Sequence, residues 1–150
     1  MWPNARDAYL ETRVLAADPV ELVGMAYQAT LVAVRDARTH LAAGDIAARS
    51  RSISKAYDIL VELANSLDHQ RAPEISKRLA ALYDYIQRRL LAANFEQKDA
   101  PLAEVLRLLT TLAEGWEGVK RQLQPPAEAA KAWKSPPPDP GAYVSQGWSF

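Results

Sequence analysis

Residues 79–94 read LAALYDYIQRRLLAAN, and this stretch decides the fold. Its apolar side chains recur at spacings of three and four residues, which places them on one face of an α-helix. We predict a helix that opens at Pro73-Glu74, ends near Asn94 and buries that face. The expected core positions are Ile75, Leu79, Leu82, Tyr83, Ile86, Leu90 and Ala93.

Four polar-tipped residues interrupt the same stretch. Asp84 and Arg88 are one helical turn apart and of opposite charge, so they reinforce the helix by a few tenths of a kcal/mol. Tyr85 and Arg89 have the same spacing, lie off the apolar face, and allow the guanidinium to stack on the ring. This second pair is either a solvated helix face or a contact surface, since Tyr and Arg are enriched at binding hot spots.

Three more helices are predicted from their start and stop signals. One opens at Asp18-Pro19, with Asp as N-cap and Pro in the first turn, and ends at Gly44. The next, capped by Asp45, spans residues 46–67, and the last opens at Asp99-Ala100-Pro101 and spans residues 99–123. Their expected core positions are Val20, Val23, Tyr27, Thr30, Val34, Ala37 and Leu41; Ile46, Ser50, Ile53, Tyr57, Leu60, Ala64 and Leu67; and Leu102, Val105, Leu109, Leu112, Trp116, Val119 and Leu123.

Short connections between these helices favour antiparallel neighbours, and no stretch alternates with the period of two that is typical of strands. We therefore predict an all-α, antiparallel up-and-down four-helix bundle over residues 18–123. Residues 1–17 are expected to form a docked N-terminal cap segment. Residues 124–150 hold six of the ten prolines together with four aromatic residues, and are expected to form an extended or disordered tail that touches something.

Composition excludes several classes of protein. Lys plus Arg and Asp plus Glu both number 18, so the formal net charge is zero, which argues against a nucleic-acid partner. The chain has no cysteine, and no apolar run approaches the roughly 18 residues of a membrane span. No secretory signal is evident at the N-terminus. We expect a cytoplasmic protein that has no membrane partner.

Catalytic and metal-binding motifs are also missing from the sequence. Neither His40 nor His69 follows a Glu at the spacing of a di-iron bundle, and no phosphate-binding glycine loop or nucleophile elbow occurs. The sequence therefore predicts no enzyme, no cofactor, no metal and no small-molecule substrate. One alternative is kept open, a phosphotransfer or other enzymatic bundle that acts through His40 or His69.

The chain resembles the flagellar export chaperones of the FliS family over about residues 5–123. Asp18-Pro19-Val20-Glu21-Leu22 is similar to the family's first bundle helix start, and Gly44-Asp45-Ile46 matches its Gly-Asp-Ile turn. Residues 55–60, residues 79–94 and Trp116-Glu117 match the later helices. Departures also occur, because Arg6 stands where the family usually has the first of two N-terminal tyrosines, and the tail after Leu123 lies outside the family pattern.

The resemblance implies a partner and a mechanism. The client would be the C-terminal region of flagellin, which is disordered as a monomer and helical in the filament. Binding along apolar grooves of the bundle would prevent premature polymerisation and assist type III flagellar secretion, with an export-gate component as a further candidate partner. The alternative is a generic interaction bundle that uses the same surface on a second copy or on another partner helix.

A groove requires apolar residues that the core leaves unused, or polar-tipped residues such as the Tyr85 and Arg89 pair. Either the N-terminal segment around Tyr9 and Val14 or the aromatic residues of the tail are expected to cover the groove in the free protein. The predicted partner-binding residues are Tyr9, Val14, Ile59, Leu63, Tyr85, Arg89, Leu106 and Ala113.

Overall fold

The computed structural model of the protein describes residues 5–16 and 18–123, and the side chains of residues 5–10 and 18–123. The described residues form five helices and no strand: α1 (Ala5–Ala16), α2 (Pro19–Ala42), α3 (Ile46–Asn65), α4 (Pro73–Glu96) and α5 (Asp99–Leu123). The chain divides into two units, Met1–Gly118 and Val119–Phe150. The first unit contains α1 to α4 and α5 as far as Gly118.

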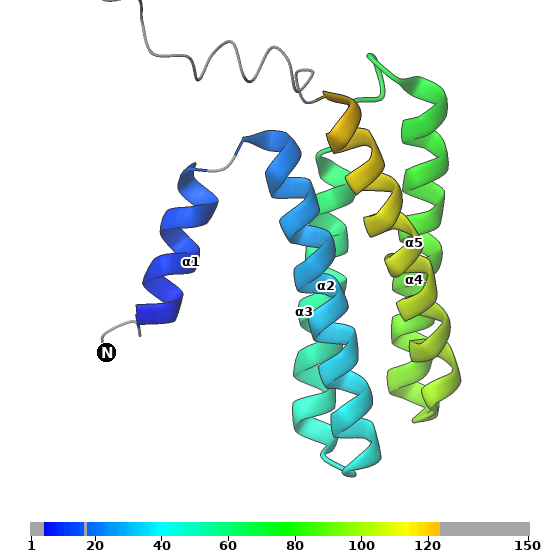
Figure 1. Cartoon of the computed structure of the whole chain (residues 1–150). Coiled ribbons are helices and arrows are strands. Elements are labelled where there is room, and N and C mark those ends of the chain that lie inside the picture. The colour runs from blue at the N-terminus through cyan, green and yellow to red at the C-terminus, as the bar shows by residue number, and fades with distance from the viewer. Residues whose placement is uncertain (1–4, 17, 124–150) are drawn as a thin grey trace, which may run out of the picture. The chain divides into compact units, whose positions relative to one another are not determined.

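Helices α2 to α5 run alternately up and down and lie side by side, as Figure 1 shows. The all-α bundle predicted from the sequence is confirmed. The N-terminal segment contains a further helix, α1, at residues 5–16. That this segment docks on the bundle stays a prediction, and the tail at residues 124–150 lies outside the described part of the chain.

The two predicted aspartates cap the starts of α2 and α3. Asp18 accepts a hydrogen bond from the backbone N–H of Glu21 at 2.8 Å, and Asp45 accepts one from Ala48 at 3.1 Å. Each bond satisfies one of the backbone donors that a helix start leaves without an intrahelical acceptor. Gly44 has a φ of +71°, the left-handed conformation expected at the end of α2.

Two helix ends differ from the prediction. Helix α3 stops at Asn65, two residues early, and Ser66 follows it with its hydroxyl donating to the Leu63 carbonyl at 2.8 Å. Such a local side-chain bond competes with continued helix. Helix α4 continues past Asn94 to Glu96, and Gln97 ends it in the left-handed conformation at φ 55°. Glycine is the usual residue in this conformation at a helix end, so Gln97 could not be recognised in the sequence as a stop signal.

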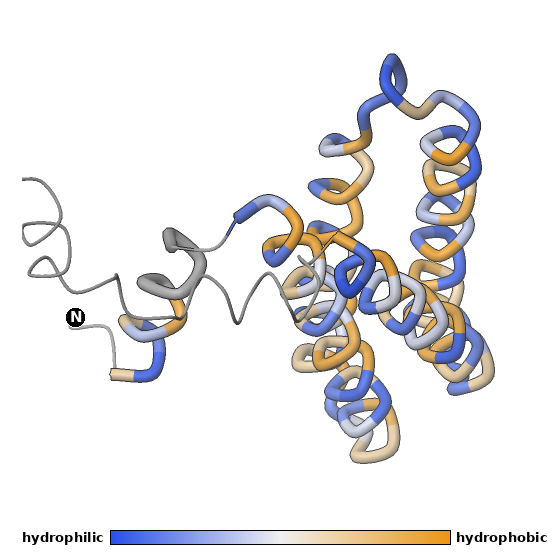
Figure 2. The backbone as a smooth tube through the Cα atoms, turned by 45° about the horizontal axis from the view of Figure 1, so that its top comes forward, coloured by the Kyte–Doolittle hydropathy of each residue, from blue (hydrophilic) through white to orange (hydrophobic). Residues whose placement is uncertain are grey.

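The core follows the predicted faces. Figure 2 shows hydrophobic residues recurring along each helix of the bundle. Four predicted positions at the helix ends are wrong, because Ile46, Ile75, Val119 and Leu123 are exposed. All four lie in the first or last turns of their helices, where few neighbouring side chains are left to cover them. The buried apolar residues of the core are Tyr27, Leu31, Ala33, Val34, Ala37, Ile53, Ala56, Leu60, Leu63, Tyr83, Ile86, Leu90, Ala93, Leu102, Val105, Leu109 and Ala113.

Helix spacing within the bundle follows side-chain size. Helices α2 and α3 form the most closely packed pair. Both bury alanines, Ala33 and Ala37 on α2 and Ala48 and Ala56 on α3, and small side chains let two helix backbones approach. Helix α5 buries mainly Leu and Val, so it reaches the bundle through longer side chains.

A buried arginine joins the start of α3 to the end of α4. Arg49 is only 4% exposed, and its Nε donates to Asn94 Oδ1 at 3.1 Å. Its Nη2 donates to the Asn94 backbone carbonyl at 3.4 Å, and Ser50 Oγ donates to Asn94 Oδ1 at 3.2 Å. The last turn of a helix carries partial negative charge on its carbonyls, which favours a cation there. The apolar pattern gave no sign of this contact.

Two tyrosine hydroxyls meet at the centre of the bundle. Tyr27 of α2 and Tyr83 of α4 are each 2% exposed, and their hydroxyl oxygens are 2.5 Å apart. Burial, followed by the hydrogen bond to Tyr27, raises the pKa of Tyr83. Tyr27 also contacts Trp116 of α5 edge to face, with ring centroids 6.4 Å apart, so three helices meet at one ring.

Removing one of these hydroxyls is expected to cost more than removing both. Tyr83→Phe leaves the buried Tyr27 hydroxyl without its partner, which costs about 1–3 kcal/mol of unfolding free energy. The double variant Tyr27→Phe with Tyr83→Phe should recover part of that loss, because no buried polar group is then unpaired. Urea unfolding followed by circular dichroism measures both. Additive losses from the two single changes would contradict the paired arrangement.

A bidentate ion pair joins α2 to the start of α5. Arg38 Nε and Nη2 lie 2.8 Å from the two carboxylate oxygens of Asp99. Hydrogen bonding to Arg38 is the main cause that lowers the pKa of Asp99. Because both side chains are well exposed, solvent screens the pair, and its contribution is on the order of 0.2–1 kcal/mol.

The lowered pKa of Asp99 predicts how its contribution changes with pH. A carboxyl whose pKa is lower in the folded chain stabilises the fold above its unfolded pKa of about 4, and this stability is lost as pH falls through the folded pKa. The Asp99→Asn variant should therefore be less stable than the parent at pH 7, with the difference shrinking below about pH 4. Thermal unfolding against pH measures this, with Asp58→Asn as the control at an exposed carboxyl of α3.

Candidate partner-binding surface

The two tyrosines of the stretch at residues 79–94 face in opposite directions, as the spacing predicts. Tyr83 is 2% exposed in the core, whereas Tyr85 is 39% exposed. Asp84 and Arg88 form the expected ion pair within α4 at 3.0 Å, with both side chains well exposed. Tyr85 thus presents an aromatic ring to solvent from the middle of a rigid helix.

Tyr85 and Arg89 are joined through a third residue that the sequence pattern did not single out. The Tyr85 hydroxyl donates to Oε1 of Glu104 on α5, and Arg89 Nη2 lies 3.4 Å from Oε2 of the same carboxylate. The hydrogen bond to Glu104 is the main cause that raises the pKa of the Tyr85 hydroxyl. The predicted pair is therefore bridged by a carboxylate of a neighbouring helix, and nothing in the spacing along α4 could have indicated it.

The other predicted residues of the bundle fall into two groups. Ile59 and Leu106 are partly buried and pack against the core with one side still accessible. Leu63 and Ala113 are core residues, 4% and 7% exposed, and offer little surface in this conformation. Both were chosen as apolar residues beyond the regular three–four stripe. They are buried because the apolar faces of α3 and α5 are wider than a single stripe.

Ile59 also lines an open hollow on the outward side of α3. The hollow has a volume of about 490 Å³, and its other lining residues are Ser50, Arg51, Ser54, Lys55 and Asp58. An apolar edge beside polar and charged groups of both signs gives this hollow a mixed character. Ile59 is the one predicted partner residue that borders it.

Of the two predicted residues in the N-terminal segment, only Tyr9 has a described side chain. Tyr9 of α1 is 65% exposed, so its ring is available for contact. The side chain of Val14 lies outside the described side chains. The structure therefore brings Tyr85 and Arg89 together through Glu104, and leaves the contact between the N-terminal segment and the bundle as a prediction.

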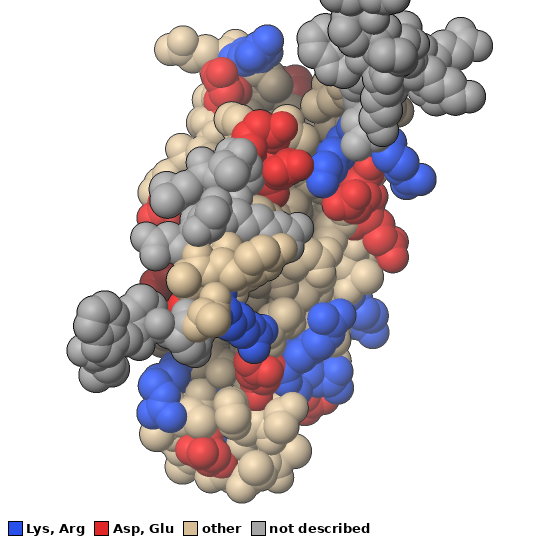
Figure 3. All heavy atoms as spheres, turned by 60° about the vertical axis from the view of Figure 1, so that its left-hand side comes forward, with Lys and Arg blue, Asp and Glu red and all other residues tan. Residues whose placement is uncertain are grey.

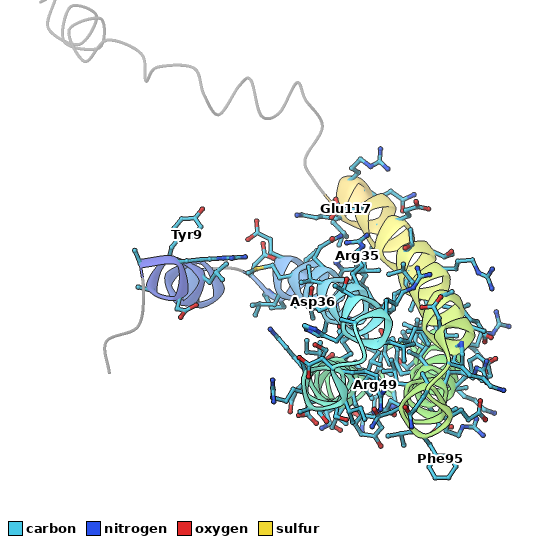
Figure 4. The ribbon with its side chains drawn as sticks, turned by 90° about the horizontal axis from the view of Figure 1, so that it is seen from below. Tyr9, Arg35, Asp36, Arg49, Phe95 and Glu117 are labelled. Atoms are coloured by element: carbon cyan, nitrogen blue, oxygen red, sulfur yellow. The ribbon has the colours of Figure 1, made fainter. Side chains whose placement is uncertain are left out.

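The folded bundle leaves exposed several apolar residues that are not among the predicted partner-binding residues. Phe95 near the end of α4 is 89% exposed and points away from the helices in Figure 4. Leu91 on α4 and Val32 on α2 are about half exposed. Exposed aromatic and aliphatic groups on a bundle whose core is already filled are typical of interaction surfaces. None of the three belongs to the predicted core stripe of its helix, and this position in the sequence pattern could have indicated their exposure.

Figure 3 shows acidic and basic side chains interspersed on the face it displays. Among the described residues, no cluster of three or more His, Cys, Asp or Glu side chains could bind a metal. The described helices include none with the length and hydropathy of a bilayer span. His40 lies half-buried in the last turn of α2, and His69 is exposed in the α3–α4 connection.

Comparison with known proteins places this chain in a family. The family model described as flagellar protein FliS matches residues 2–123, which include α1 and the whole bundle. The chain belongs to the FliS family. The match covers all of the partner-binding residues predicted above, Tyr9 and Val14 included.

Relatives from three bacteria support this assignment. The flagellar secretion chaperone FliS of Salmonella typhimurium is 36% identical over 111 residues, which cover 73% of this chain and 82% of that protein. FliS of Bacillus subtilis is 33% identical over 114 residues, covering 76% and 84%. The flagellar secretion chaperone FliSB of Pseudomonas aeruginosa is 32% identical over 110 residues, covering 73% and 87%.

The opposite orientations of the two tyrosines predict opposite effects of truncation in this FliS-family chain. Tyr83→Ala removes a buried ring and should lower the unfolding free energy by about 3–5 kcal/mol. Tyr85→Ala should change it by less than about 1 kcal/mol, because the side chain is exposed. Urea unfolding of the two variants checks this. Equal losses would contradict the assignment of the two rings to different faces.

Proposed function

We propose that this protein is a cytoplasmic export chaperone that binds the C-terminal segment of flagellin and keeps it from polymerising before secretion. Membership of the FliS family, with relatives named flagellar secretion chaperones, is the observation that carries the proposal. Binding is competitive, because the apolar stripe that drives filament assembly is occupied while the client is held. The complex is then passed to a component of the export gate.

Apolar surface left over by the folded bundle supports this mode of binding. Leu91 and Phe95 on α4, Val32 on α2 and Tyr85 beside α5 are exposed although the core is filled. A segment that is disordered when free can fold its apolar face onto such surfaces as it binds. The client loses conformational entropy at that step, so affinity depends on burying enough of this surface.

The N-terminal segment provides a cover for the groove in the free chaperone. Residues 1–17 include Tyr9, whose ring is exposed, and Val14 one to two turns further along α1. A helix with aromatic and aliphatic groups has the same chemistry as the proposed client, so the two compete for one surface. Release of this segment would accompany client binding.

Removal of the client's C-terminal segment should weaken binding strongly. Purified full-length protein is expected to bind the cognate flagellin in isothermal titration calorimetry, with a negative heat-capacity change from apolar burial. Flagellin that lacks its last ~40–50 residues should show at least a tenfold loss of affinity, which corresponds to about 1.4 kcal/mol.

The matched control is a flagellin shortened by the same length at its N-terminus, which should keep its affinity. Equal binding of the two shortened flagellins would overturn the proposal in favour of another partner. A parallel measurement of molar mass by light scattering identifies self-association. A stable dimer without affinity for flagellin would support the generic interaction bundle.

A further inference from the structure

Glu104 of α5 contacts both Tyr85 and Arg89 of α4. Its Oε1 accepts the Tyr85 hydroxyl and its Oε2 pairs with Arg89 Nη2 at 3.4 Å. Both carboxylate oxygens are therefore used, one for each side chain. Glu104 itself is partly buried and lies outside the hydrophobic core cluster.

This arrangement holds an exposed side chain in one position before any partner arrives. Immobilising a free side chain on binding costs about 0.5–1.5 kcal/mol, which is about a two- to thirteenfold loss of affinity. A tyrosine already held through its hydroxyl avoids much of that cost. The ring of Tyr85 remains available for apolar contact, because only its tip is engaged by Glu104.

Arg89 is only partly satisfied by the same carboxylate. Its Nε is buried and has no hydrogen-bond acceptor among the described residues, and its single ion-pair contact is long. A guanidinium normally binds a carboxylate through two parallel bonds, as Arg38 does with Asp99. Arg89 thus retains donor capacity that the fold does not use.

We propose that Glu104 is a positioning residue of the partner surface, which holds Tyr85 for apolar contact and Arg89 for an oxygen acceptor of the bound segment. The acceptor is a carboxylate or carbonyl oxygen of the partner, which approaches the accessible part of the Arg89 guanidinium while the contact with Glu104 is kept. The inference rests on the proposed function for the identity of the partner. Its first part, the positioning of Tyr85, applies to the free protein.

A double-mutant cycle tests the coupling between Glu104 and Tyr85. Binding of the C-terminal flagellin segment is measured by calorimetry for the parent, Tyr85→Phe, Glu104→Ala and the combined variant. Tyr85→Phe is expected to weaken binding about three- to tenfold in the parent and less than twofold in the Glu104→Ala background. Equal effects in both backgrounds, or tighter binding by Glu104→Ala, would overturn the proposal.

Conservative and control variants separate positioning from stability. Glu104→Gln retains an acceptor for the Tyr85 hydroxyl but not the charge for Arg89, so it should keep most of the Tyr85 coupling. Glu114→Ala removes an exposed carboxylate of the same helix and should leave the affinity unchanged. All variants should unfold at urea concentrations close to the parent's. Loss of affinity that follows loss of stability would assign Glu104 a purely structural role.

A measurement on the free protein distinguishes failure of this inference from failure of the proposed function. Nuclear magnetic resonance follows the titration of the Tyr85 ring, and the midpoint should fall when Glu104 is replaced by Ala. An unchanged midpoint would overturn the positioning role whatever the client is. A shifted midpoint in a protein that does not bind flagellin would refute the proposed client and leave the positioning of Tyr85 in place.

Discussion

The hydrogen bond between Tyr27 and Tyr83 is the constraint on which the arrangement of the bundle depends. Aliphatic side chains can pack in several registers at similar cost, whereas two buried hydroxyls are satisfied in only one. Trp116 adds a third helix to this centre, since its ring contacts Tyr27 and its Nε1 donates to the Val20 carbonyl at 2.9 Å. Gly24 lies beside the indole, and a Cβ at this position would be 3.4 Å from Trp116 Cδ1, an ordinary van der Waals distance.

The filled core leaves several large apolar side chains on the surface of the bundle. The interior is complete without Phe95, Leu91 or Val32, so their exposure does not follow from a lack of space. Under the proposed function, these exposed apolar side chains contact the client. The bridged side chains of Tyr85, Arg89 and Glu104 add a polar group in a fixed position to the same surface. Binding of a client would then require little change in the bundle itself.

Periodicity was sufficient to predict the fold but not the contacts between helices. The three–four spacing along residues 79–94 identified Tyr83 as core and Tyr85 as exposed, and the caps Asp18 and Asp45 located two helix starts correctly. A spacing rule describes one helix at a time. It could not indicate that Glu104 reaches Tyr85, that Arg49 is buried against Asn94, or that Leu63 and Ala113 belong to the core, because each depends on how neighbouring helices are rotated.

The balance of charge in this chain affects how readily the protein self-associates as its concentration rises. With equal numbers of acidic and basic residues, and both signs interspersed on its surface, copies of the chain have little net repulsion to keep them apart. Exposed apolar groups such as the Phe95 ring can then contact one another between copies, so self-association increases with the concentration of the protein. Under the proposed function, we expect the amount of this protein to be kept close to the amount of flagellin, so that the apolar surface is occupied for most of the protein's lifetime.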